Sequence, residues 1–285
     1  MFSMDEEYFA ELQKECCWFT LPFFEELPNV DPNKDILNDP IWENDTYVIR
    51  HIFAMIFGGF GFSVDLKNAK LLATIKFSQV ESQSPSDKSL NNPAYISWLG
   101  KYAQYNILLG TVFAYLHNYN IAAYLLLNGL KTRAITLFMP YCDFIKHIIS
   151  KVEEMSSEPA EYLGCGFSVN EPIGGIELNG GTLFPQVAEM LIPSLEGDNG
   201  EMVLSYRGSQ RYGTLKRLHS TRSENFSNII DVYEVLLITR KFEIKKLRLY
   251  FNGYFTHENR HQIRVPNGFH INPWSEAAEF LEIVY

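Results

Sequence analysis

The sequence has few cysteines, and their spacing excludes a disulfide-stapled fold. Of the four, Cys16 and Cys17 are adjacent, while Cys142 and Cys165 stand alone. This spacing matches neither a disulfide framework nor a paired Cys-x-x-Cys zinc site. The amino terminus also lacks the basic and apolar segments of a presequence, since five of its first fifteen residues are acidic. We therefore expect a chain of a reducing compartment, the cytoplasm.

The sequence also lacks an uninterrupted apolar run that would span a bilayer. Residues 102–130 carry no formal charge over 29 residues, but polar side chains interrupt them throughout. The group His117-Asn118-Tyr119-Asn120 divides the stretch into two pieces that are too short to cross a membrane. We interpret these pieces as buried helices and expect no membrane partner.

Positive charge is scarce in the first two thirds of the chain. Residues 1–200 hold 12 basic and 25 acidic side chains, whereas residues 201–285 hold 12 basic and 9 acidic ones. Within 206–264 the balance is 12 basic to 5 acidic, a composition that can follow the phosphates of a nucleic acid or a nucleotide. No run exceeds two adjacent basic residues, however, so a solvated strand face is favoured over nucleic-acid binding.

The spacing of apolar residues changes from helical to strand-like along the chain and predicts an α+β fold. A helical N-terminal half is packed on, or precedes, a β-rich C-terminal half. We divide the chain into a helical region at 1–118 and an α+β domain at 119–285, with strands mainly from 161 onward. The helical spacing predicts helices at 5–19, 43–57, 65–80, 93–117, 119–128, 133–155, 186–191 and 276–283. Alternation predicts strands at 162–169, 173–178, 201–207, 232–240, 242–251 and 261–265.

Glu234 is the most informative single residue, because it is one carboxylate at the head of a strongly apolar strand. Such an acid is either paired across a hairpin or catalytic. Pairing would involve Arg240, Lys241 or Lys245 on the next strand. For catalysis we expect Glu234 to begin a central, largely buried strand and to face a cleft.

The segment Val232-x-Glu234-Val235-Leu236-Leu237, followed by Lys241-Phe242-x-Ile244, resembles the glutamate-bearing strand of ADP-ribosyltransferases and the strand after it. The resemblance covers about residues 119–265. It implies that Glu234 is the catalytic glutamate, which stabilises the positive charge on the ribose of NAD as nicotinamide leaves. The family is common among bacterial toxins and effectors. The resemblance therefore also implies export without an N-terminal signal peptide as the alternative to the cytoplasm.

Tyr162-Leu163-Gly164 falls where this family has Tyr-Arg-Gly, with Leu163 in place of the arginine that clamps the NAD phosphates. The resemblance implies contacts to NAD from Tyr162, Gly164 and Thr182. Thr182, with Ser168, stands in for the family's Ser/Thr-x-Ser strand. Loss of the clamp implies weak NAD binding and degenerate catalysis, unless an arginine elsewhere beneath Glu234 takes its place.

A second motif, His257-Glu258-Asn259-Arg260-His261, satisfies His-Glu-x-x-His. On a helix it would direct His257 and His261 to one zinc ion, with Glu258 as the base, as in a zinc hydrolase. The preceding residues instead resemble a strand and a turn, which favours a hairpin with Glu258 and Asn259 at its tip. We therefore expect no bound metal.

Two classes of function follow from the sequence. The first is NAD-dependent, ADP-ribosyltransferase-like transfer to a protein target. The second is a non-enzymatic interaction module whose acidic helical half binds an unknown protein partner. The zinc hydrolase is a third and less favoured alternative.

Overall fold

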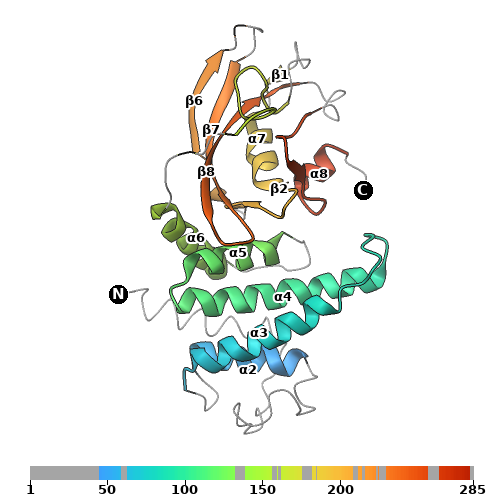
Figure 1. Cartoon of the computed structure of the whole chain (residues 1–285), viewed down its shortest axis with the longest axis vertical. Coiled ribbons are helices and arrows are strands. Elements are labelled where there is room, and N and C mark those ends of the chain that lie inside the picture. Colours follow the sequence, from blue (N-terminus) through green and yellow to red (C-terminus); the bar gives the residue numbers. More distant parts are fainter. Residues whose placement is uncertain are drawn as a thin grey trace. The chain divides into compact units, whose positions relative to one another are not determined.

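The structure is a computed structural model of the whole chain and confirms the α+β class (Figure 1). Helices fill the first half, and a six-stranded antiparallel sheet lies in the second. The residues that the structure describes are 45–58, 63–131, 139–155, 159, 162–174, 182–183, 185–207, 211–213, 216–222, 224, 229–255 and 263–282. The predicted helix at 5–19 and the motif at 257–261 lie outside them.

The predicted helices at 43–57, 65–80, 93–117, 119–128 and 133–155 are confirmed where the structure describes them, with small changes at their ends; residues 43–44 and 133–138 lie outside the described part. Local capping explains two of the starts. The side chain of Asp65 accepts the amide N–H of Asn68, and that of Asn92 accepts the N–H of Ala94, just before a proline at the first helical position. The helices are α2 (Asp45–Phe57), α3 (Leu66–Ser82), α4 (Pro93–Tyr115), α5 (Tyr119–Leu130) and α6 (Met139–Glu154).

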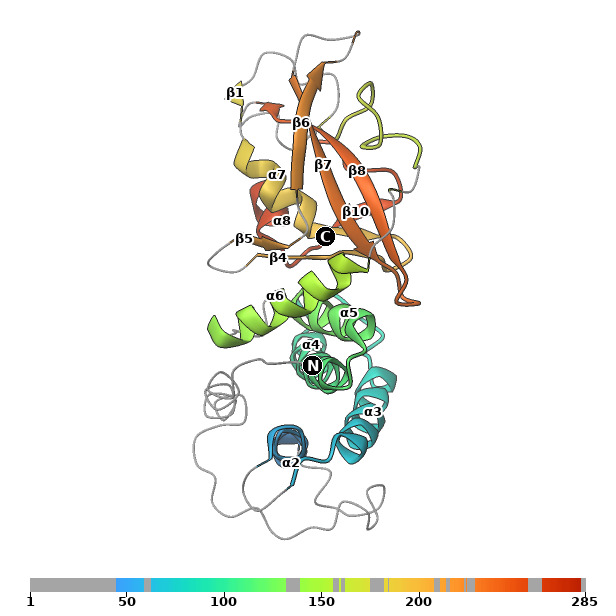
Figure 2. The ribbon, with the colours of Figure 1, turned by 90° about the vertical axis from the view of Figure 1, so that its left-hand side faces the viewer.

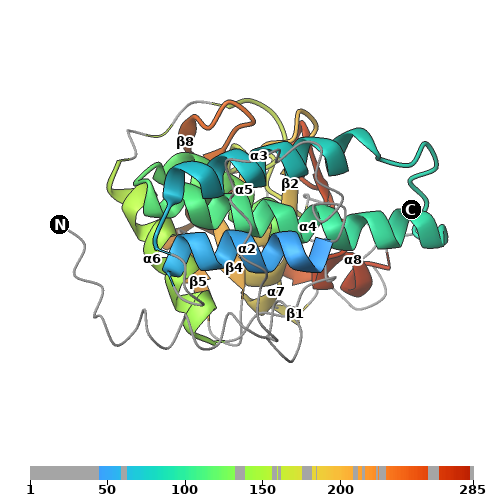
Figure 3. The ribbon, with the colours of Figure 1, turned by 90° about the horizontal axis from the view of Figure 1, so that it is seen from below.

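Helix α4 forms the centre of the helical unit, and α2 and α3 run along it (Figure 3). The Tyr105 side chain of α4 is fully buried. Its hydroxyl donates a hydrogen bond of 2.9 Å to Asp45 Oδ1 at the start of α2. Burial and the neighbouring carboxylate both raise the pKa of Tyr105 far above its ordinary value. One buried phenol thus joins α4 to α2 and satisfies the polar group that it carries inside.

Helices α4 and α5 pack closely because glycine lies at their contact. A Cβ added at Gly129 would lie 2.6 Å from Ile107 Cγ1 and 2.8 Å from the carbonyl oxygen of Ala103. The uncharged stretch 102–130 is therefore a helical hairpin, as the sequence predicts, and much of it is buried. Among the described residues, no helix is long and apolar enough to cross a membrane.

The chain divides into two compact units near residue 131. Helices α2 to α5 belong to the first unit, while α6 divides at Ile145 and Lys146. The sequence-based division at 118 placed α5 with the second part, whereas in the structure α5 packs on α4.

The second unit is built on a sheet whose strand order is β10-β2-β3-β7-β6, with β8 paired to the other side of β7 (Figure 2). Strand β7 (Ile229–Ile238) is central, as predicted for the strand of Glu234. The other strands of this sheet are β2 (Leu195–Gly197), β3 (Met202–Val203), β6 (Lys216–Arg222), β8 (Ile244–Asn252) and β10 (Phe269–Ile271). Two short ribbons pair β1 (Thr182–Leu183) with β9 (Tyr254–Phe255), and β4 (Ser205–Arg207) with β5 (Arg211–Gly213).

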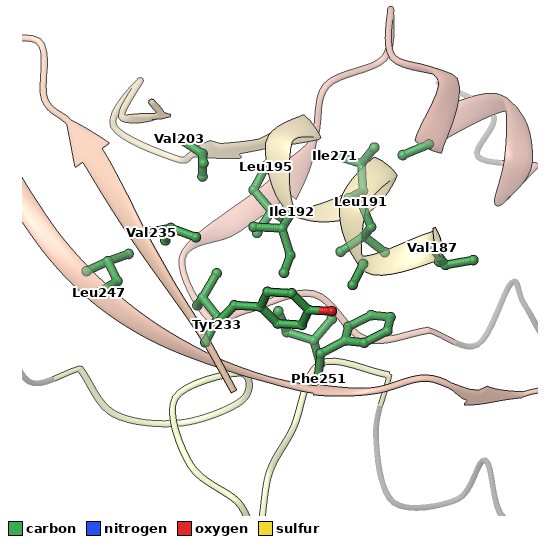
Figure 4. Packing of buried hydrophobic residues seen from close by; sticks show 14 of the residues in the cluster. Val187, Leu191, Ile192, Leu195, Val203, Tyr233, Val235, Leu247, Phe251 and Ile271 are labelled. Carbon is green, nitrogen blue, oxygen red and sulfur yellow. The ribbon is translucent and has the colours of Figure 1, made fainter. Parts of the chain in front are cut away.

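One face of β7 packs against helix α7 (Pro185–Leu191), the following 3-10 turn η3 (Ile192–Ser194) and helix α8 (Glu276–Phe280). Figure 4 shows Tyr233 of β7 and Phe251 of β8 beneath the side chains of α7 and η3, with Val235 and Leu247 to one side of them in the same cluster. The opposite face of β7 is also largely buried, since Val232 is 1% and Leu236 2% exposed. A strand buried on both faces explains the continuous apolar run in its sequence.

Four strand predictions, at 162–169, 173–178, 232–240 and 261–265, differ from the structure, and residues 175–178 and 261–262 lie outside the described part. Residues 162–174 form a loop with isolated bridges, because Gly164 and Gly166 adopt positive φ angles of 95° and 86°. Residues 263–266 are not a strand either. Strand β7 begins at Ile229 rather than Val232, so Glu234 lies in its middle and not at its head. The sequence interpretation also missed β6, whose polar composition hides its alternation.

Replacing Gly129 by alanine should lower the free energy of unfolding by about 1–3 kcal/mol, because the new methyl group overpacks the contact between α4 and α5. Gly100 of α4 is the matched control. A Cβ there meets nothing within 4 Å, so Gly100→Ala should stabilise by about 0.5–1 kcal/mol. Urea denaturation of both variants measures the difference. Equal effects would contradict the close packing at Gly129.

Candidate functional site

The acids of β7 are divided between the two faces of the sheet by the alternation of the strand. Glu234 lies on the same face as Val232 and Leu236, whereas Asp231 lies on the face of Tyr233 and Val235. The two carboxylates therefore cannot act at one site, and each must be considered with the neighbours on its own face.

Glu234 is surrounded by basic positions on both neighbouring strands. In the antiparallel register it stands opposite Lys216 of β6 and Arg248 of β8. Its Oε1 lies 3.8 Å from Nζ of Lys246, and the two side chains are 23% and 22% exposed. The predicted pairing with Arg240, Lys241 or Lys245 is thus replaced by an ion pair to Lys246, which lies diagonally across on the same face. A pair of this length and exposure contributes little stability, at most about 1 kcal/mol.

Arg248 of β8 is an arginine that lies close to Glu234 in the sheet. Cross-strand neighbours directly opposite each other have Cβ atoms about 5 Å apart, and Arg248 has this relation to Glu234. Its side chain is exposed. An exposed guanidinium beside a partly exposed carboxylate can bind an anion while the carboxylate faces a cationic or polarised group of the same ligand.

The three residues that the resemblance assigns to NAD binding lie on other segments. Tyr162 stacks on Phe167 with ring centroids 5.1 Å apart, and Leu163 between Tyr162 and Gly164 is 90% exposed. The segment that holds Tyr162 and Gly164 meets β8 at both ends: Pro159 forms a bridge with Lys246, and the Tyr250 amide donates to the Gly166 carbonyl at 2.9 Å.

Thr182 lies beyond the C-terminal end of β8. It pairs with Phe255 on β9, seven residues beyond Arg248, which corresponds to roughly 20 Å of extended chain. Neither the loop of Tyr162 nor the strand of Thr182 is a hydrogen-bonded neighbour of Glu234 on β7. The residues that neighbour Glu234 in the sheet are instead Lys216, Lys246 and Arg248.

Sequence reasoning missed Asp231, the more deeply buried acid of β7. Its side chain is 9% exposed, and its Oδ1 accepts hydrogen bonds of 2.7 Å from both Arg217 Nη2 and Ser220 Oγ. The same Nη2 also donates to Ser220 Oγ at 2.6 Å. The alternation of β7 could have identified this residue, because it places Asp231 on the apolar face of Tyr233, Val235 and Leu237.

The polar cluster of Asp231, Arg217 and Ser220 also affects Tyr233. The pKa of Tyr233 is raised to about 12, chiefly by burial and also by the Asp231 and Glu189 carboxylates, while Arg217 partly opposes the increase. The ring lies in the core beneath α7 (Figure 4). Arg217 is 53% exposed, so the cluster reaches from the core to the surface. Its chemistry fits a structural anchor between β6 and β7, since its buried carboxylate is already satisfied.

The predicted zinc motif, and most of the acidic residues of the first half, lie in parts of the chain that the structure does not describe. His257, Glu258 and His261 lie outside the described residues, and the described residues contain no group of three or more acidic, histidine or cysteine side chains that could hold a metal ion. The acidity of the first half is concentrated in residues 1–44, which hold 11 acidic and 2 basic side chains. Residues 45–131, which include α2 to α5, hold 4 acidic and 7 basic ones.

Comparison with known proteins adds no relative. No protein-family model, curated protein or solved structure matches this chain.

Substitution of the two acids of β7 should have unequal effects on the free energy of unfolding. Asp231→Ala removes the acceptor of two hydrogen bonds, one of them from a guanidinium, and should lower the free energy of unfolding by about 1.5–3 kcal/mol. Glu234→Gln is the control within the same strand and should cost at most about 1 kcal/mol. Chemical denaturation distinguishes the two. A larger loss for Glu234→Gln would contradict the assignment of Asp231 as the anchor.

The raised pKa of Tyr233 should make the protein less stable in alkali. The unfolded chain releases a tyrosine proton near pH 10, whereas folded Tyr233 retains it to about pH 12. The contribution is therefore complete below about pH 10 and is lost as the pH rises to about 12. Denaturation curves across this interval should show a shallower decline for Tyr233→Phe than for the wild type. Identical slopes would show that Tyr233 is not the group responsible.

Proposed function

We propose that this chain is an ADP-ribosyltransferase-like protein that binds NAD on the face of the sheet carrying Glu234. The observation that carries the proposal is the register of β7 and β8, which sets Arg248 opposite Glu234. In this chain Leu163 stands where the family has the arginine that binds the NAD phosphates. Arg248 supplies a guanidinium for these phosphates from a neighbouring strand.

Arg248 and Lys246 have the properties of a phosphate clamp. Both lie on the face of Glu234, Arg248 is exposed, and Lys246 retains 22% exposure beside the carboxylate. A guanidinium binds phosphate through paired N–H donors, and a nearby ammonium adds a second positive charge. The ion pair between Lys246 and Glu234 is long, at 3.8 Å, so Lys246 can turn toward a phosphate at small cost.

Glu234 has the surroundings of a group that stabilises positive charge. Its neighbours along the strand on the same face, Val232 and Leu236, are almost fully buried, which lowers the local dielectric and strengthens the field of the carboxylate. Bound NAD would supply the ADP-ribosyl group for transfer to a protein target. Glu234 would face the ribose carbon at which the bond to nicotinamide breaks. Contacts from Tyr162, Gly164 and Thr182 remain predictions from the resemblance alone.

NAD binding should depend on Arg248 and hydrolysis on Glu234. In isothermal titration of the full chain with NAD, Arg248→Ala should weaken binding about ten- to a hundredfold, because one charge-assisted phosphate contact contributes about 1.5–3 kcal/mol. Glu234→Gln should change the dissociation constant only slightly but abolish the release of nicotinamide from NAD.

Lys241→Ala is the matched control, since Lys241 is an exposed basic residue in the turn between β7 and β8. It should leave both measurements unchanged. Absence of NAD binding by the wild type, or equal weakening by Lys241→Ala and Arg248→Ala, would reject the proposed site.

A further inference from the structure

Strand β6 is an edge of the six-stranded sheet. It ends the strand order, and within the described part of the chain it pairs with β7 alone. Figures 1 and 2 show it on the outside of the sheet beside β7. In an antiparallel pair, alternate residues of an edge strand direct their backbone N–H and C=O groups outward. These groups form a template onto which another extended chain can add.

The edge is strongly basic. The sequence of β6, Lys-Arg-Leu-His-Ser-Thr-Arg, holds three positive charges and a histidine, and it contains no acid. The side chains of Arg217, His219, Ser220 and Arg222 are all exposed. At the end of the partner strand β7, Ile229 opposite Arg222 is 37% exposed and adds an apolar contact point.

The edge is also held in place before any partner arrives. Asp231 of β7 accepts hydrogen bonds from Arg217 and Ser220 of β6. The register shifts between Arg217 and His219, and from His219 to Arg222 it is regular along β7. Residues 219–222 are therefore a preorganised strand, so a partner would not bear the entropy of ordering it.

We propose that β6 is the docking edge for an extended acidic peptide of a partner protein, which adds to the sheet as a further strand. A second copy of the chain would place one basic β6 against another, and like charges opposite each other are destabilising. The same charges favour a strand with Glu or Asp at alternate positions, since each opposite-charge pair across strands contributes about 0.2–1 kcal/mol. The backbone bonds supply affinity, and the side chains supply the choice of partner. This docking does not depend on NAD binding.

The test uses the full chain and a fluorescently labelled peptide of alternating glutamate and valine, with fluorescence anisotropy as the readout. The peptide should bind, and its affinity should fall with added salt because the charges are exposed. Alternating lysine and valine should not bind. A glutamate-valine peptide N-methylated on alternate amides should also fail, because it loses the backbone donors while it keeps every charge.

Two variants complete the design. The double variant His219→Glu with Arg222→Glu should reduce affinity at least tenfold, while Lys241→Glu, in an exposed turn off the edge, should leave it within about twofold. Circular dichroism and the urea midpoint of each variant confirm folding. Equal binding of the N-methylated peptide would show that charge alone holds the peptide, without backbone pairing to β6, and would overturn the proposal. So would absence of binding, or light scattering that shows self-association of the chain.

Discussion

The architecture of the second unit depends on strand β7, which is buried on both faces and nevertheless carries two carboxylates. A buried charge is costly unless neighbouring groups satisfy it, so the strands on either side must provide its partners. Strand β6 contributes Arg217 and Ser220 to Asp231, and β8 contributes Lys246 to Glu234. One basic residue of each strand, Arg217 of β6 and Lys246 of β8, is explained by this requirement.

Alternation gives the two acids different chemistry although they are three residues apart. Asp231 is directed toward the core, has a side chain that is only 9% exposed, and is already bonded to a guanidinium and a hydroxyl. Glu234 is directed to the other face, retains partial exposure and, among the described side chains, forms a long ion pair to Lys246. A satisfied buried acid contributes to stability, whereas a loosely paired and accessible one can interact with a ligand. Of the two acids, Glu234 is therefore the one that is accessible to a ligand.

Local features of the sequence predicted the helices and the central strand, because those elements depend on neighbouring residues. The capping residues Asp65 and Asn92 and the apolar run of β7 are examples. The loop at 162–174 and strand β6 depend instead on distant partners. The apolar and aromatic residues around Gly164 and Gly166 imitate a strand, but the positive φ of both glycines breaks it. Strand β6 is polar, and its register is determined by Asp231 and a shift beside His219.

The same distinction applies to the candidate site. In the family that the Glu234 strand resembles, the arginine that clamps NAD lies in a Tyr-x-Gly triplet, and this chain has Leu163 at that position. In the structure that triplet lies in a loop with Leu163 exposed to solvent, whereas Arg248, 14 positions after Glu234 in the sequence, is its direct neighbour across the strands. Pairing register, which no local pattern specifies, therefore decides which cation can serve this carboxylate. In the proposed NAD site the phosphate-binding charge therefore comes from β8, a strand that places Arg248 on the same face as Glu234.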